Sequence, residues 1–316
     1  MADFFSLNVL QTALEVGLIY ALVAMALFVS FSILNIADLS TDGCFTLGCA
    51  VGAMLTIAGH PILAIFAAMA AGICSGYVTA FLQTRLGVES ILAGIIVNTG
   101  LYTINLGVMG FSSNVSIFGC DTVFTLTRSL LGDSSVSRIV LLAVIALLVC
   151  VALIRFFGTT LGLSIRATGD SPDMVSASSI NPKFTITVGL CLANALTALA
   201  GCLIGQYNKT CDINLGTGMV TIALASLIIG EVFAGKKGGI PRRVFCVVLG
   251  SIVYRFIIAI ALRLNVSTEY FKLVSAVIVA VAIAAPKLKE RVKLEKAKSA
   301  ARRAHQLQQK GGSADA

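Results

Sequence analysis

The chain has 316 residues, of which 57% are hydrophobic and 12% are charged, and its formal net charge is +8. Soluble domains are about half apolar and about a quarter charged, so this composition excludes an ordinary soluble protein and predicts a polytopic membrane protein. The excess of basic residues is greatest in the segment 287–316. This segment predicts a basic cytoplasmic tail that faces anionic lipid, and we expect no nucleic-acid partner.

Nine apolar blocks are long enough, or nearly long enough, to cross a membrane, which takes about 20 residues. They predict an all-α protein with about nine spans (eight to ten), forming a transmembrane domain over 1–286. The second and seventh blocks are short and contain Gly, which suggests discontinuous helices. The blocks are 8–33, 41–58, 61–83, 90–110, 138–157, 185–207, 218–234, 242–264 and 270–285.

Lys and Arg predict how the chain is oriented, because they gather in cytoplasmic loops. Basic residues cluster in 155–183, in 236–243 and in the tail, and even numbers of spans separate these clusters. All three clusters can therefore be cytoplasmic at once, with the C-terminus inside and the N-terminus outside. The first apolar block is too long for a signal-peptide core and is expected to be an uncleaved helix. The turn at 59–61, the loop 111–137 and the turn around Lys209 would then face outside.

Two polar segments indicate a weak internal repeat. Residues 35–43 precede the short second block, and residues 211–218 precede the short seventh block. They lie five spans apart, and an odd offset makes the two halves inverted in the membrane. Inverted repeats with short, Gly-interrupted segments indicate a transport pathway between the halves. The alternative is a chance likeness between two ordinary polar loops.

Polar residues in and before the apolar blocks are candidates for that pathway. A carboxylate near mid-membrane costs about 2.5–3.5 kcal/mol, so Asp38 and Asp42 either line a pore at the start of a discontinuous helix or lie in a cytoplasmic loop. Asn98 and Asn105 share one helix face, and they either line a polar path or hydrogen-bond neighbouring helices. The candidate pathway residues are Asn35, Asp38, Ser40, Asp42, Asn98, Asn105, Asp212 and Asn214.

Residues for catalysis, metal binding or disulfide formation are few in this sequence. The two histidines, His60 and His305, lie in a turn and in the tail, so we expect no catalytic group and no metal site. The nine cysteines are an odd number without a CxxC pair; most are expected to be reduced packing residues, and a disulfide between Cys120 and Cys211 is an open possibility. Arg255 lies near the middle of the eighth block and needs a partner there; Glu231 of the adjacent seventh block is one candidate for a structural ion pair. Glycines at four-residue spacing, such as Gly48 and Gly52, predict close helix packing.

The polar run 158–184 separates two strongly apolar blocks and forms a cytoplasmic loop in this topology. Within it, residues 170–178 predict a short helix with Ser171 as N-cap, Pro172 in the first position and Asp173 in the first turn.

This loop resembles the ATPase-contacting loop of bacterial ABC-importer permeases of the branched-chain amino acid and ribose type. The resemblance rests on Gly162, Arg166-Ala167, Gly169 and Ile180-Asn181, and the segments 34–40, 212–216 and 225–231 are also similar to that family. Ser178-Ser179 departs from the Ala or Gly that usually precedes Ile-Asn. The likeness covers about residues 15–285 and is nearest to a subgroup linked to aromatic amino acid (tryptophan or tyrosine) uptake.

The resemblance implies a multi-pass permease subunit of a bacterial inner (plasma) membrane importer for a small polar solute, with an amino acid favoured. It implies a second, identical permease subunit, two cytoplasmic ATPases that bind ATP and Mg²⁺, and an extracytoplasmic solute-binding protein. This chain would bind no cofactor and would not be an enzyme. The residues implied in ATPase coupling are Arg166, Ala167, Gly169, Asp170, Pro172, Asp173, Ser176 and Asn181.

Two alternatives remain open on the sequence. One is an ion-coupled secondary transporter that uses Asp38, Asp212 or Glu231 as a coupling carboxylate. The other is the same ABC permease role with a sugar or nucleoside as the solute.

Overall fold

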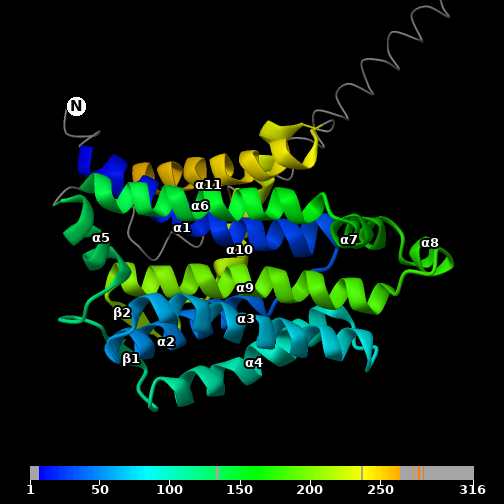
Figure 1. Ribbon diagram of the computed structural model, residues 1–316, viewed down its shortest axis with the longest axis horizontal. Helices are drawn as coiled ribbons and strands as arrows, with labels where there is room; N and C mark the ends of the chain where they lie inside the picture. The colour runs from blue at the N-terminus through cyan, green and yellow to red at the C-terminus, as the bar shows by residue number, and fades with distance from the viewer. Residues whose placement is uncertain are drawn as a thin grey trace, which may run out of the picture.

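The computed structural model describes residues 7–132, 135–235 and 238–263, and the single positions 273, 277 and 280. The described residues form α-helices, one short π-helix and two short strands (Figure 1). In chain order these are α1 (Leu7–Leu27), η2 (Phe28–Ile33), α2 (Thr41–Ile57), α3 (Pro61–Thr84), α4 (Ser90–Val108), β1 (Asn114–Ser116), α5 (Val123–Leu131), α6 (Ser135–Phe157), α7 (Thr160–Asp170), α8 (Pro172–Ala177), α9 (Pro182–Asn208), β2 (Thr210–Asp212), α10 (Met219–Ala234) and α11 (Ile240–Arg263).

Six helices of the described residues are long and apolar enough to cross a membrane, and α2 and α10 are shorter apolar helices. They coincide with the first eight apolar blocks, so an all-α polytopic membrane protein is confirmed. The ninth block 270–285, the tail 287–316 and the lysines at 236 and 237 lie outside the described residues, apart from the three single positions. The total of nine spans and the direction of the termini therefore stay predictions.

Two long helices form the centre of the bundle. The apolar window of α1 is 78% buried and that of α9 is 83% buried, whereas α3, α4, α6 and α11 bury about a third or less. Figure 1 shows α9 between a layer that contains α1, α6 and α11 and a layer that contains α2, α3 and α4. The outer helices therefore present wide apolar faces, as lipid contact requires.

The two ends of the bundle carry different structures (Figure 1). At one end, β1 pairs antiparallel with β2, with Val115 opposite Cys211, and α5 lies at the same end, packed against α6. Thr122 and Thr125 form a capping box at the start of α5, a helix that lies within the predicted outside loop 111–137. At the opposite end lie α7 and α8, which belong to the polar run 158–184.

Glycine allows α2 and α3 to approach α9 closely. A methyl group at Gly48 would overlap the backbone of Ala198, and one at Gly201 would overlap the carbonyl oxygen of Phe45. Gly72 of α3 lies in the same way against the backbone of Asn194. The prediction that four-residue glycine spacing marks close helix contacts is confirmed, because any side chain at these positions would separate the helices.

The expected partner of Glu231 was wrong. Glu231 pairs with Arg243, whose Nη2 lies 2.8 Å from Glu231 Oε1. The guanidinium of Arg255 instead lies over the ring of Tyr20, at 3.7 Å from its centroid, a cation–π contact that suits a cation in an apolar bundle.

Cysteines in the described residues are free thiols. Cys211 is buried with its sulfur 3.9 Å from that of Met109, and Cys120 is partly exposed. The structure contains no disulfide between these two residues.

Candidate functional site

The first span ends in an irregular stretch. The helix α1 continues into the π-helix η2, after which residues 34–38 have no regular structure. Asn35 has a left-handed backbone (φ 57°), a conformation that Asn tolerates better than most residues. The break lets the chain turn back into the bundle before α2 begins at Thr41.

Asp38 fixes this returning segment. It is 3% exposed, and its Oδ1 accepts hydrogen bonds from the Ser40 backbone N–H at 2.9 Å and the Ser40 hydroxyl at 2.6 Å. Its Oδ2 accepts a bond from Nδ2 of Asn194 at 2.9 Å. Asn194 lies near the middle of α9, so α2 starts about halfway along that central helix. A buried carboxylate needs such partners, and Asp38 therefore serves here to hold the start of α2.

Asp42 joins the starts of the two short helices. It lies in the first turn of α2, and its carboxylate accepts hydrogen bonds from the backbone N–H groups of Gly218 and Val220, both at 2.9 Å. These two donors belong to the N-terminus of α10, where backbone N–H groups lack intrahelical partners. The hydroxyl of Thr46 also accepts a bond from the Gly216 N–H at 3.1 Å. One carboxylate thus lies at two helix N-termini, the place where a negative charge is most favourable.

The two short helices run from this common point toward opposite ends of the bundle. Along α2, Gly48 lies against Ala198 and Gly52 against Cys202, so α2 runs toward the β1–β2 end of α9. Along α10, Glu231 reaches Ser32 at the end of η2, which lies beside α7. Each helix therefore covers about half of the bundle. The polar segments 35–43 and 211–218 are the stretches that lead into these two half-length helices.

A cavity of about 310 Å³ lies beside this meeting point. Its wall comes from the start of α2, from α4 and from the segment before α10. Four of the predicted pathway residues line it together: Asp42, Asn98, Asn105 and Asn214. The other lining residues are Gly43, Thr46, Thr99, Tyr102, Ile213 and Thr217.

Asn105 and Asn98 contribute the α4 side of the cavity. Asn105 is 1% exposed, and its Nδ2 donates to the carbonyl oxygen of Gly43 at 3.0 Å, while its Oδ1 has no hydrogen-bond partner. A methyl group at Gly43 would lie 2.6 Å from Oδ1 of Asn98, so that oxygen sits at the start of α2. Asn105 thus both bonds a neighbouring helix and lines the cavity, which combines the two alternatives left open by the sequence.

The other four pathway candidates lie outside the cavity wall. Asp38 and Ser40 belong to the buried network with Asn194. Asp212 is on β2, where its carboxylate accepts the Asn214 N–H at 2.8 Å. Asn35 occupies the irregular stretch after η2.

The candidate coupling residues lie at the opposite end from the β1–β2 pair. The sequence predicted one helix over 170–178, but the structure has two, because α7 continues to Asp170 and Pro172 begins α8. Pro172 is in the first turn of α8 and Ser171 is its N-cap, as expected, although the Ser171 side chain makes no capping bond. Seven of the eight candidates are exposed, and Gly169 is partly buried: the exposed ones are Arg166, Ala167, Asp170, Pro172, Asp173, Ser176 and Asn181.

Gly169 brings α7 against the end of the first span. A methyl group at this position would overlap the carbonyl oxygen of Ile33, the last residue of η2. The side chain of Leu34, the next residue, fills the space beside Gly189 of α9. Helix α7 is thus in direct contact with the segment that leads to Asp38 and α2, and α8 packs against α7.

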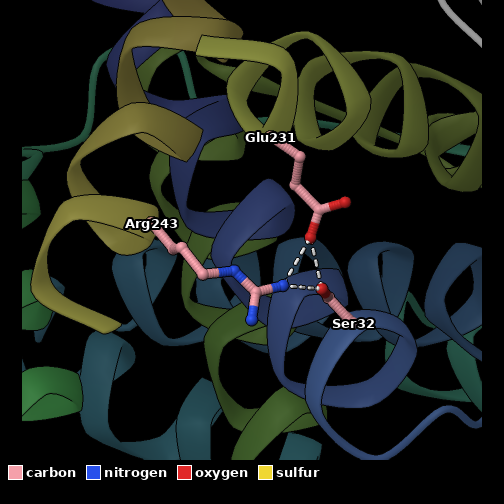
Figure 2. Close-up of polar contacts among 3 residues, drawn as sticks. All are labelled: Ser32, Glu231 and Arg243. Atoms are coloured by element: carbon pink, nitrogen blue, oxygen red, sulfur yellow. Dashed lines mark hydrogen bonds and ion pairs between the residues drawn. The ribbon is translucent and has the colours of Figure 1, made fainter. Parts of the chain in front are cut away.

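A second polar cluster joins the same segment to α10 and α11 (Figure 2). Nη2 of Arg243 donates to Oγ of Ser32 at 2.6 Å and to Oε1 of Glu231 at 2.8 Å, and the Ser32 hydroxyl also donates to Glu231. The Arg243 guanidinium further lies 5.1 Å from the centroid of the Phe28 ring. The three helices that meet here are tied by one charge-assisted network.

Sequence reasoning missed Asn194, Thr46 and Arg243 as members of these clusters. Asn194 is a single polar residue in a buried apolar span, which is a usable signal for a helix-to-helix hydrogen bond. Thr46 and Arg243 carry no comparable signal, since Thr is common in membrane helices and Arg243 belongs to a positive-inside cluster.

Comparison with known proteins supplies the family. Residues 9–283 match the family model described as the branched-chain amino acid transport system / permease component. The chain belongs to this permease family. It is therefore a transport subunit, and an integral multi-pass protein of the bacterial cell membrane.

Several curated relatives of the permease carry a stated solute. This chain is 30% identical over 283 residues to the tyrosine transport system permease protein of Clostridioides difficile, and the match covers 89% of this chain and 92% of the relative. It is 26% identical over 290 residues to the ribose import permease protein RbsC of Escherichia coli, with coverage of 89% and 86%. It is 30% identical over 277 residues to the D-allose transport system permease protein AlsC of Escherichia coli, with coverage of 84% and 79%. No solved structure matches the chain.

Proposed function

We propose that this permease is the membrane subunit of an ATP-binding-cassette importer, and that the cavity beside Asp42 is part of the path of a small polar solute. The observation that carries this proposal is the meeting of the α2 and α10 N-termini at one carboxylate, next to a polar cavity. Half-length helices that end inside the bundle are how many transporters expose backbone dipoles to a solute.

ATP and Mg²⁺ are bound by a partner ATPase in this proposal, and the permease itself holds no cofactor. The ATPase would contact α7 and α8 on the cytoplasmic side. Support comes from Met174 of α8, a large apolar side chain that is 71% exposed, and from Leu163 of α7, which is 51% exposed. Exposed apolar side chains on short helices outside the bundle favour contact with another protein.

Movement of α7 and α8 would reach the solute path through the end of the first span. Gly169 contacts Ile33, and Ser32 of the same π-helix is bonded to Glu231 of α10 and Arg243 of α11. Nucleotide binding by the ATPase would thereby shift a two-state bundle that has no energy source of its own.

The complete importer would contain two copies of this permease, two ATPase subunits and an extracytoplasmic solute-binding protein, surrounded by membrane lipid. The binding protein would meet the end that carries β1, β2 and α5, because that end lies opposite α7 and α8 (Figure 1). The second copy would close the solute path from the other side.

An amino acid is the solute that we favour, because the relative with a tyrosine transport name combines 30% identity with coverage of 89% of this chain and 92% of the relative. The ribose relative is 26% identical, and the allose relative is covered over 79% of its length. The ribose and allose relatives support a sugar as the second candidate. The ion-coupled alternative loses support at Asp38, whose two carboxylate oxygens are both engaged in the buried network.

A matched pair of substitutions tests the assignment of the two ends. Met174→Glu places a charge on α8, and Phe118→Glu places one on an equally exposed apolar residue, 70% exposed, at the end that carries β1 and β2. We expect Met174→Glu to abolish co-purification of the ATPase and ATP-driven uptake, while Phe118→Glu retains the ATPase. If Met174→Glu retains the ATPase and full uptake, α8 is not the contact and the proposal is wrong.

A further inference from the structure

The cavity beside Asp42 is rich in oxygen atoms. Among the residues that the structure describes, its lining contains one carboxylate, three Asn side chains, three Thr hydroxyls and one Tyr hydroxyl, and no Lys, Arg or His. Several of these groups are already committed: Thr46 accepts from Gly216, and Thr99 donates to the carbonyl oxygen of Ile95 at 2.9 Å. The remaining acceptors need hydrogen-bond donors from whatever enters the cavity.

Asn105 has an acceptor without a partner. Its orientation is determined by Gly43, because a carbonyl oxygen can only accept and therefore requires Nδ2 of Asn105 to face it. Oδ1 is consequently the free atom, in a side chain that is 1% exposed and lines the cavity. A buried acceptor without a partner is costly, so such an atom at a cavity wall points to a ligand that donates to it.

Asp42 retains unused acceptor capacity beside Asn105. Each of its oxygens accepts one backbone N–H, whereas a carboxylate can accept about four hydrogen bonds. The N-termini of α2 and α10 carry partial positive charges that together offset the carboxylate. The cavity therefore suits a solute with no net charge overall but with a strong local donor.

We propose that Asp42, Asn98 and Asn105 bind the ammonium group of a small zwitterionic solute. The proposal rests on the proposed function and specifies the chemistry that the path recognises. An ammonium group has three N–H donors and no acceptor, which matches a wall of free oxygens. A sugar hydroxyl can also donate to the carboxylate, but it carries no positive charge and therefore gains less from it than an ammonium group does. The volume of about 310 Å³ lies at the lower end of the range for small-molecule sites, about 300–1,000 Å³.

A single-tryptophan reporter can test this directly. The chain contains no Trp, so Tyr102→Trp, at a half-exposed lining residue, gives one fluorescent side chain at the cavity. The full-length reporter permease in tryptophan-free polymer nanodiscs is titrated with L-tyrosine, tyramine, 3-(4-hydroxyphenyl)propionate and D-ribose. Tyrosine has an ammonium and a carboxylate, tyramine only the ammonium, the propionate only the carboxylate, and ribose only hydroxyls.

We expect tyrosine and tyramine to change the fluorescence at concentrations at least about tenfold lower than the propionate and ribose, because a hydrogen bond to a charged group contributes roughly a factor of ten or more in affinity. Added to the reporter, Asn105→Leu and Asn98→Leu should each weaken the binding of tyrosine and tyramine by about tenfold. Asn98→Leu guards against misfolding, since no hydrogen bond of Asn98 holds the helices together. Gly100→Ala on α4 is the control, because a methyl group there meets no atom within 4 Å.

Preference for the propionate or ribose, equal response to all four probes, or the absence of a response to tyrosine and tyramine would overturn the proposal. So would unchanged binding of the amines in both the Asn98→Leu and Asn105→Leu variants. Failure here is distinguishable from failure of the proposed function, because ATP-driven uptake by the complete importer is measured independently of the reporter.

Discussion

The contact between Asp42 and the start of α10 leads to a quantitative prediction. Asp42→Ala removes the acceptor of two backbone N–H groups, Gly218 and Val220, each at 2.9 Å. A hydrogen bond to a charged group contributes about 1.5–3 kcal/mol, so complete loss of both would cost about 3–6 kcal/mol. Both donors are partly buried, and water in the cavity can replace part of the loss. We therefore expect about 3 kcal/mol for opening the first turn of α10.

Amide hydrogen exchange measures this opening locally. A loss of about 3 kcal/mol corresponds to roughly a hundredfold faster exchange when exchange follows the opening equilibrium. In the Asp42→Ala permease, the peptide that covers 216–222 should exchange about a hundredfold faster than in the unchanged protein, while peptides from the middle of α9 should be unaffected. Asp121→Ala, at a carboxylate in an exposed contact at the β1–β2 end, is the control and should change neither region. Unaltered exchange in 216–222 would refute the role of Asp42 as the link between the two half-length helices.

Three further predictions concern the connections around the half-length helices. Gly169→Val should separate α7 from Ile33 and reduce ATP-driven uptake by at least tenfold at unchanged membrane yield; normal uptake would contradict the contact as a coupling route. Arg243→Ala should weaken uptake more than Arg242→Ala, because of these two residues Arg243 is the one that bonds Glu231 and Ser32. Equal effects of the two substitutions would contradict a role of this network in uptake. Asn194→Leu leaves Oδ2 of Asp38 without its donor and should lower stability by about 1–3 kcal/mol, seen as a lower yield of folded protein, with full yield as the contrary result.

The sequence predicted the helices well because membrane spans depend on local composition. Apolar blocks predicted the six described membrane-crossing helices, and the shortness of the second and seventh blocks correctly marked the half-length helices α2 and α10. The start of α8 could also be predicted from neighbouring residues, because within a helix Pro172 fits best in the first turn and Ser171 directly precedes it.

Contacts between distant segments could not be predicted in the same way. Asp42 bonds residues 176 and 178 positions away, and no local pattern distinguishes its role from that of Asp38, which bonds Asn194 instead. The partner of Glu231 was missed for a geometric reason. Glu231 lies near the end of α10 and Arg243 near the start of α11, and the two helices pack antiparallel. Arg255 is 12 residues further along α11, or about 18 Å at 1.5 Å per residue.

The energy source for uptake is the most direct test of the whole account. Proteoliposomes are prepared with the permease alone and with the permease, its ATPase and its solute-binding protein, and uptake of labelled L-tyrosine is followed with ATP or with a Na⁺ or H⁺ gradient. We predict accumulation only in the complete complex with ATP, and none by the permease alone under any gradient. Concentrative uptake by the permease alone, driven by a cation gradient, would contradict the account.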